Sequence, residues 1–182
     1  MRKGFLRYSL WVLVCFSMVA CNDWLDVKPK TEMEAEEMFS TEQGFKDALA
    51  GVYTAITKPS LYGRELTYGI TDVVAQQWSN IGSNHRYANA LKYEYEATNT
   101  KPTIDTLWIG LYNAIANANS ILSYIDNSKV TFTKDNQQII KGEALALRAY
   151  LHFDLLRLFC KDAKSTTAED GIPYVDELTK QV

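Results

Sequence analysis

Cysteine and histidine are scarce in this chain, and their scarcity narrows the chemistry that it can perform. Among 182 residues there are three cysteines and two histidines, His85 and His152. Neither histidine belongs to an H-E-x-x-H pair, and the sequence contains no G-x-S-x-G or G-x-x-x-x-G-K-[ST] motif. We therefore expect no metal, no cofactor and no catalytic residues.

An excess of positive charge is also missing. Lysine and arginine number 19 against 22 aspartate and glutamate residues, which gives a formal net charge of −3. Sequence-independent binding of nucleic acid depends on a basic surface. Nucleic acid is therefore excluded as an expected partner.

No apolar run is long enough to cross a membrane, which takes roughly 20 residues. The run from Leu10 to Ala20 is shorter, follows a basic start and precedes polar residues, as in a secretory signal. Cys21 comes directly after Met18-Val19-Ala20, a sequence that resembles the lipobox of bacterial lipoproteins. We predict that residues 1–20 are a lipoprotein signal peptide and that Cys21 carries the lipid anchor. The alternative is a secreted protein without acylation.

The remaining cysteines leave no possibility of an intramolecular disulfide. Cys15 is removed with the signal and Cys21 is taken by lipid, so that Cys160 alone remains. We interpret Cys160 as a small apolar structural residue. The exported chain must then be stabilised by its hydrophobic core.

Apolar residues at helical spacing predict three long helices within residues 40–182, after a lipid-anchored tether at 21–39. The first follows a capping box at Ser40 and Gln43, and buries the stripe from Phe45 to Ile56. The second starts near Thr103 and ends near Ile125. The third is capped by Thr133 and runs to about Phe159.

Two long amphipathic helices joined by a short polar loop form an antiparallel hairpin. We predict that Leu111, Leu147 and Phe153 are core positions of this hairpin, because each lies on the apolar stripe of its helix. Trp108 and Tyr112 lie on the same stripe and are interpreted as core. The polar residues of the third helix are interpreted as a structural cluster: Arg148, His152, Asp154 and Arg157.

The segment from Ser60 to Pro102 has no clear period and allows loop, short helix or short strand. It contains four residues that we propose as ligand-binding: Trp78, Asn84, Arg86 and Tyr87. A flat aromatic ring suits the face of a sugar, amide and guanidinium donors suit its hydroxyl groups, and loops carry binding more often than helix faces. The alternative is that Trp78 packs on the helical layer. Glu94 and Glu96 are read as a solvated face and not as a glycosidase pair.

Three stretches together resemble the SusD/RagB family of outer-membrane nutrient-binding lipoproteins. They are the start of the mature chain at 23–29, a W-x-x-L-Y-x-A-I-x-x-A-N-x-x-L helix at 108–122, and an E-A-x-x-L-R-A-x-x-x-F-x-L helix at 143–155. Cys160 stands where the family commonly has glycine. Gly171-Ile172-Pro173 corresponds to a G-x-P turn that usually follows a shorter gap.

The resemblance implies a mostly all-α fold of tetratricopeptide-like helical hairpins with long irregular loops. It also implies that the chain is only the N-terminal portion of a typical member, and so an incomplete fold. The implied function is non-catalytic: a surface-exposed lipoprotein of the outer membrane that captures a glycan or peptide for a SusC-like TonB-dependent transporter. A tetratricopeptide-type scaffold that holds partner proteins, and a secreted hydrolase, are the alternatives.

Overall fold

The computed structural model describes residues 30–161 and 171–178 of the chain. It divides into two compact units, Met1–Glu37 and Met38–Val182. The predicted signal peptide, Cys21 and the start of the tether lie outside the described residues. Helix α2, Lys30–Met38, falls within the range expected to be tether, and the sequence analysis did not predict it.

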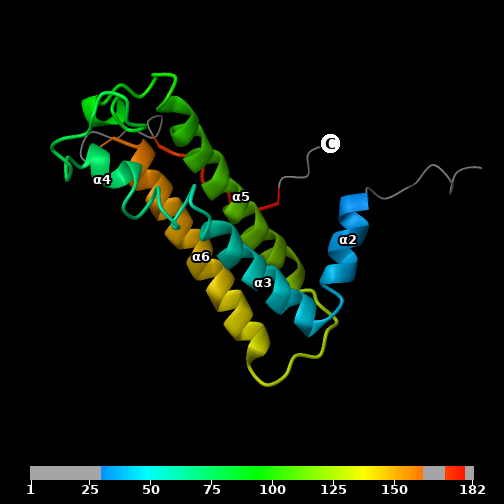
Figure 1. Ribbon diagram of the computed structural model, residues 1–182. Helices are drawn as coiled ribbons and strands as arrows, with labels where there is room; N and C mark the ends of the chain where they lie inside the picture. Colours follow the sequence, from blue (N-terminus) through cyan, green and yellow to red (C-terminus); the bar gives the residue numbers. More distant parts are fainter. Residues whose placement is uncertain (1–29, 162–170, 179–182) are drawn as a thin grey trace, which may run out of the picture. The chain divides into compact units, whose positions relative to one another are not determined.

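Three long helices build the second unit: α3 (Glu42–Ile56), α5 (Lys101–Ile125) and α6 (Asn136–Phe159). Helices α5 and α6 pack along each other as a hairpin, and α3 lies against both of them (Figure 1). Pro102 lies in the first turn of α5, where its missing N–H breaks no helical hydrogen bond. No strand occurs in the described part of the chain, so the prediction of an all-α fold is confirmed.

The core forms where the apolar stripes of the three helices meet. Leu111 is fully buried and Leu147 is 8% exposed, as predicted. Each stripe recurs at three- and four-residue steps, which keeps its members on one helical face. The buried stripe residues include Phe45, Leu49, Val52 and Ile56 in α3, Leu107, Leu111, Ile115 and Ile125 in α5, and Ile140, Ala144, Leu147, Leu151 and Leu155 in α6.

The prediction that Phe153 belongs to the core is wrong. Its side chain is 54% exposed, and the guanidinium of Arg157 lies over its ring at 5.3 Å. Phe153 follows the buried Leu151 by two residues, which at about 100° per residue places it on the opposite side of the helix. Helix α6 is apolar around most of its circumference, so its sequence does not mark the buried face.

Two predicted helix caps are also wrong. The N-cap of α3 is Thr41, whose hydroxyl accepts a hydrogen bond from Gly44 N at 3.0 Å, and not Ser40. The N-cap of α6 is Asp135 rather than Thr133. The Thr133 amide instead donates to the carboxylate of Glu42 at 2.7 Å, which joins the start of α3 to the α5–α6 turn.

The segment between α3 and α5 is mostly turns, with a short helix α4 (Ile70–Val74) and a 3₁₀ turn η1 (Ala90–Lys92) that contact each other. Residues 60–102 contain no strand, although the sequence allowed a short one there. The segment is held to α5 by Leu61, which is buried against Gly110. A Cβ atom at position 110 would lie 2.9 Å from the Leu61 side chain, so a larger residue there would force Leu61 to shift.

Candidate functional site

A buried carboxylate, Glu65, organises the irregular segment before α5. The residue is only 1% exposed. An isolated charge is strongly disfavoured in such a position unless it is paired and hydrogen-bonded. The residues around Glu65 supply that compensation.

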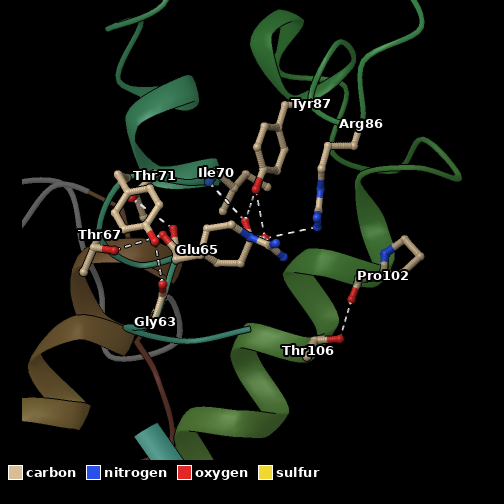
Figure 2. A network of polar contacts seen from close by, with 11 residues as sticks. Gly63, Glu65, Thr67, Ile70, Thr71, Arg86, Tyr87, Pro102 and Thr106 are labelled. Carbon is tan, nitrogen blue, oxygen red and sulfur yellow. Dashed lines mark hydrogen bonds and ion pairs between the residues drawn. The ribbon is translucent and has the colours of Figure 1, made fainter. Parts of the chain in front are cut away.

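Both oxygens of the Glu65 carboxylate are saturated with donors (Figure 2). Arg64 Nη2 lies 2.8 Å and Arg86 Nη2 lies 3.1 Å from Oε1. The Tyr87 hydroxyl lies 2.9 Å from Oε1 and 2.8 Å from Oε2, and the Ile70 amide donates to Oε2 at 3.2 Å. The carboxylate therefore links the turn after α3 to α4 and to the loop before η1.

Gly69 allows this arrangement by lacking a side chain. A Cβ atom there would lie 2.8 Å from Oε2 of Glu65 and 2.7 Å from its Cα, which is closer than carbon atoms normally approach. Any larger residue would push the carboxylate away from its donors.

The electrostatics of the cluster favour a neutral Tyr87 hydroxyl. Burial raises the pKa of the Tyr87 hydroxyl, and its hydrogen bond to Glu65 raises it further. The hydrogen bond to Glu65 likewise raises the pKa of Arg64. Two guanidinium groups share one carboxylate, and the side chain of Arg86 remains 48% exposed. Its guanidinium also stacks over the Tyr87 ring at 4.9 Å, which fixes a cationic hydrogen-bond donor at the surface.

Of the four residues proposed as ligand-binding, the structure brings Arg86 and Tyr87 together on Glu65. Tyr87 is 8% exposed, so its ring supports Arg86 and offers little surface to a ligand. Trp78 is 53% exposed and does not pack into the helical layer; Asn84 is exposed as well. Among the described residues, neither Trp78 nor Asn84 contacts the Glu65 carboxylate.

Neither Glu65 nor Arg64 was predicted as a site residue from the sequence. Two partners of Glu65, Arg86 and Tyr87, lie 21 and 22 residues further along the chain, in a segment without periodicity. The one available signal was a glutamate set between Leu61, Leu66 and Ile70, apolar residues that favour burial.

A second polar cluster lies on the α5–α6 hairpin. Tyr112 and Asn119 from α5, and Arg148 and His152 from α6, all contact the extended segment 171–178, and we call these four side chains the strand clamp. The four polar residues of α6 that were predicted to form one structural cluster are divided in the structure, with Arg148 and His152 on the segment. Asp154 and Arg157 form a separate ion pair of 2.9 Å, and the hydroxyl of Tyr62 donates to the buried Asp154 at 2.5 Å.

The contacts of the strand clamp with the segment are short. Tyr112 Oη donates to Pro173 O at 2.8 Å, and Asn119 Nδ2 donates to Val175 O at 2.9 Å. Arg148 Nη1 donates to Asp176 O at 2.9 Å and to Asn119 Oδ1 at 3.0 Å. Burial is the main cause that raises the pKa of Tyr112. The predicted core residue Tyr112 thus lies at the edge of the core, half-buried, with its hydroxyl group used by the segment.

Within residues 30–161 and 171–178, no three His, Cys, Asp or Glu side chains come together as a metal site. No helix in the same residues is both long enough and apolar enough to span a bilayer.

Comparison with known families decides what kind of chain this is. A model of the SusD-like proteins, described as "Starch-binding associating with outer membrane", matches residues 23–182. The chain belongs to this SusD-like family. The match covers α3, α5 and α6 together with the segment 171–178, so the resemblance in the sequence motifs is confirmed.

Curated SusD-like relatives include two proteins of Formosa agariphila. SusD-like protein P25 is 23% identical over 158 residues, which cover 82% of this chain and 29% of the relative. SusD-like protein P2 is 23% identical over 173 residues, covering 93% of this chain and 31% of the relative. The chain thus spans less than a third of the length of these relatives. No solved structure matches it significantly.

Proposed function

We propose that this SusD-like chain serves nutrient capture at the bacterial outer membrane without catalysing a reaction. The observation that carries the proposal is the match of residues 23–182 to a family described as starch-binding and associated with that membrane. The ligand is a glycan or a peptide. We further propose that the captured ligand passes to a SusC-like TonB-dependent transporter, as the resemblance implies.

The segment between α4 and η1 supplies chemistry suited to a glycan. Trp78 presents an exposed aromatic ring, and Arg86 presents a guanidinium that Glu65 and Tyr87 hold in place. A donor that is fixed before the ligand arrives loses less entropy on binding. We propose that Trp78, Asn84 and Arg86 contact the ligand, whereas Tyr87 positions Arg86.

Attachment to the membrane is proposed to come from lipid on Cys21. The cysteine follows the apolar run that reads as a signal, and the chain carries no excess of basic residues that could bind acidic lipid headgroups. Two or more acyl chains anchor a protein stably, because each buried CH₂ contributes about 0.8 kcal/mol. The mature protein is then proposed to face the cell exterior.

A ligand screen tests this function against both alternatives. Titration calorimetry would measure binding of soluble starch, other soluble polysaccharides and a peptide digest, and chromatography would follow the same mixtures for products. Saturable binding without turnover is the expected result. Product formation would indicate a hydrolase, and a failure to bind any ligand combined with stable association with another protein would indicate a scaffold.

A further inference from the structure

The strand clamp recognises a polypeptide almost entirely through its main chain. Its four hydrogen-bonding side chains reach carbonyl oxygens or the amide of residues 173–177. Among the side chains of the segment, the ring of Tyr174 has its centroid 4.5 Å from that of His152, and Ile172 and Val175 are half-buried. Most side chains of the segment are exposed, with Tyr174 at 64%.

The order of these contacts defines how the segment runs. Tyr112 binds Pro173 and Asn119 binds Val175, so the segment runs parallel to α5; His152 binds Val175 and Arg148 binds Asp176, so it runs antiparallel to α6. Tyr112 and Asn119 are seven residues apart, a rise of about 10.5 Å along a helix. The residues that they contact, Pro173 and Val175, are two positions apart, which an extended chain covers in about 7 Å. The clamp therefore follows the direction of the segment, and its side chains converge on a short stretch of main chain.

His152 requires a backbone N–H group at position 175 of the segment. Its Nδ1 lies 2.8 Å from the carbonyl oxygen of Arg148, which can only accept, so Nδ1 carries the proton. Nε2 is then the acceptor for the Val175 amide at 3.1 Å. A proline at position 175 has no N–H to donate, whereas any other residue does.

We propose that the strand clamp is a binding site for extended peptides, and that the chain's own residues 172–177 are its built-in occupant, which another peptide can replace. The main chain is common to all peptides, so the site accepts many sequences. Preference is restricted to an aromatic residue that stacks on His152 and to a non-proline residue immediately after it. The site uses no residue of the segment between α4 and η1. A test of peptide binding at the strand clamp is therefore independent of a test of glycan binding at Trp78.

A variant that empties the clamp tests the proposal. Val175→Pro in the full chain removes the amide that His152 accepts, and Val175→Ala is the matched control because it keeps that amide. The probe is a fluorescein-labelled peptide with the sequence of residues 171–178, and fluorescence anisotropy measures its binding. We expect Val175→Pro to bind the peptide about tenfold more tightly than Val175→Ala does, since one hydrogen bond less holds the built-in occupant. Equal affinities, with helix content unchanged in circular dichroism, would overturn the proposal.

Two further peptides separate main-chain recognition from recognition of this one sequence. A peptide with the other residues scrambled, but with tyrosine and valine kept in place, should bind within about threefold, whereas a peptide with proline in place of valine should lose about tenfold. Failure of the scrambled peptide would reject recognition through the main chain.

The unmodified chain supplies a test that does not depend on how Val175→Pro folds. Hydrogen exchange at the Val175 amide should accelerate when unlabelled peptide is added in large excess, because the built-in segment is displaced. An exchange rate that does not change at any peptide concentration would contradict displacement.

Discussion

The hydroxyl of Tyr87 lies within hydrogen-bond distance of both carboxylate oxygens of Glu65, at 2.9 and 2.8 Å. The two residues are 22 positions apart, and their contact closes the irregular segment between α3 and α5 into a fixed loop. The same carboxylate holds Arg86 at 3.1 Å, so the geometry of the proposed ligand-binding surface depends on a buried carboxylate.

Removal of that charge should destabilise the fold. In Glu65→Gln the carboxylate becomes a neutral amide, which leaves Arg64 and Arg86 without a counter-charge. Loss of one partner from a fully buried pair costs 3–5 kcal/mol, and the partial exposure of both arginines reduces our expectation to about 2 kcal/mol of unfolding free energy. Urea unfolding of the variant and of Glu96→Gln, an exposed glutamate, provides the comparison. A Glu65→Gln protein as stable as the Glu96→Gln control would refute the structural role of the cluster.

Truncation of buried and of exposed side chains in the helical core should have different effects on stability, which tests which side of α6 is buried. Leu111→Ala and Leu147→Ala should each lower the free energy of unfolding by about 2 to 5 kcal/mol, because each leaves a cavity in the packed hairpin. Phe153→Ala should cost less than about 1 kcal/mol, since that ring is 54% exposed. Chemical denaturation of the three variants measures the difference. A cost for Phe153→Ala equal to that of Leu147→Ala would mean that α6 is rotated relative to the described arrangement.

Acid should weaken the link between α3 and the α5–α6 turn. Hydrogen bonds from Lys46, Thr133 and Asn136 lower the pKa of Glu42 from its ordinary 4.5 to about 2. Because the folded-state pKa lies below the unfolded value, the stability that Glu42 contributes is fully present above about pH 4.5 and is lost as the pH falls towards about 2. Melting temperatures recorded across this range should therefore fall less steeply for Glu42→Gln than for the parent protein. Parallel pH profiles would show that the Glu42 contacts do not stabilise the fold.

The anchor can be tested by cell fractionation. Cys21→Ala removes the thiol that lipid would modify, so the variant should leave the membrane fraction while the parent protein stays in it. Cys160→Ala is the matched control, because that cysteine lies at the end of α6 and has no proposed part in anchoring. Retention of Cys21→Ala in the membrane fraction would reject the lipoprotein assignment.

The long helices could be predicted because their buried residues follow one another at helical spacing. Phe45, Leu49, Val52 and Ile56 alone define one face of α3, so both the helix and its orientation could be read from the sequence. The caps could not, because Ser40 and Thr41 carry equivalent hydroxyl groups. Backbone conformation decides between them. Phe153 was misplaced since apolar residues surround α6 and give no preferred face.

The polar clusters could not be predicted, because their partners are distant in the sequence. Asn119 and Val175 are 56 residues apart, and Arg148 and Asp176 are 28 apart. Hydrophobic periodicity reports only which face of an element is buried. It carries no information on which loop returns to a given helix, so the partners of the strand clamp and of the Glu65 cluster could not be identified from it.

The most direct test of the proposed function is the affinity of Trp78→Ala for whichever polysaccharide of the screen binds the parent protein most tightly. Phe153→Ala is the matched control, because it removes an equally exposed aromatic ring, 54% against 53%, from a different surface. Loss of an aromatic stacking surface should weaken binding about tenfold in Trp78→Ala, with its melting temperature unchanged, while Phe153→Ala binds like the parent. Unaltered affinity in Trp78→Ala, measured in the same calorimetric titration, would contradict the account.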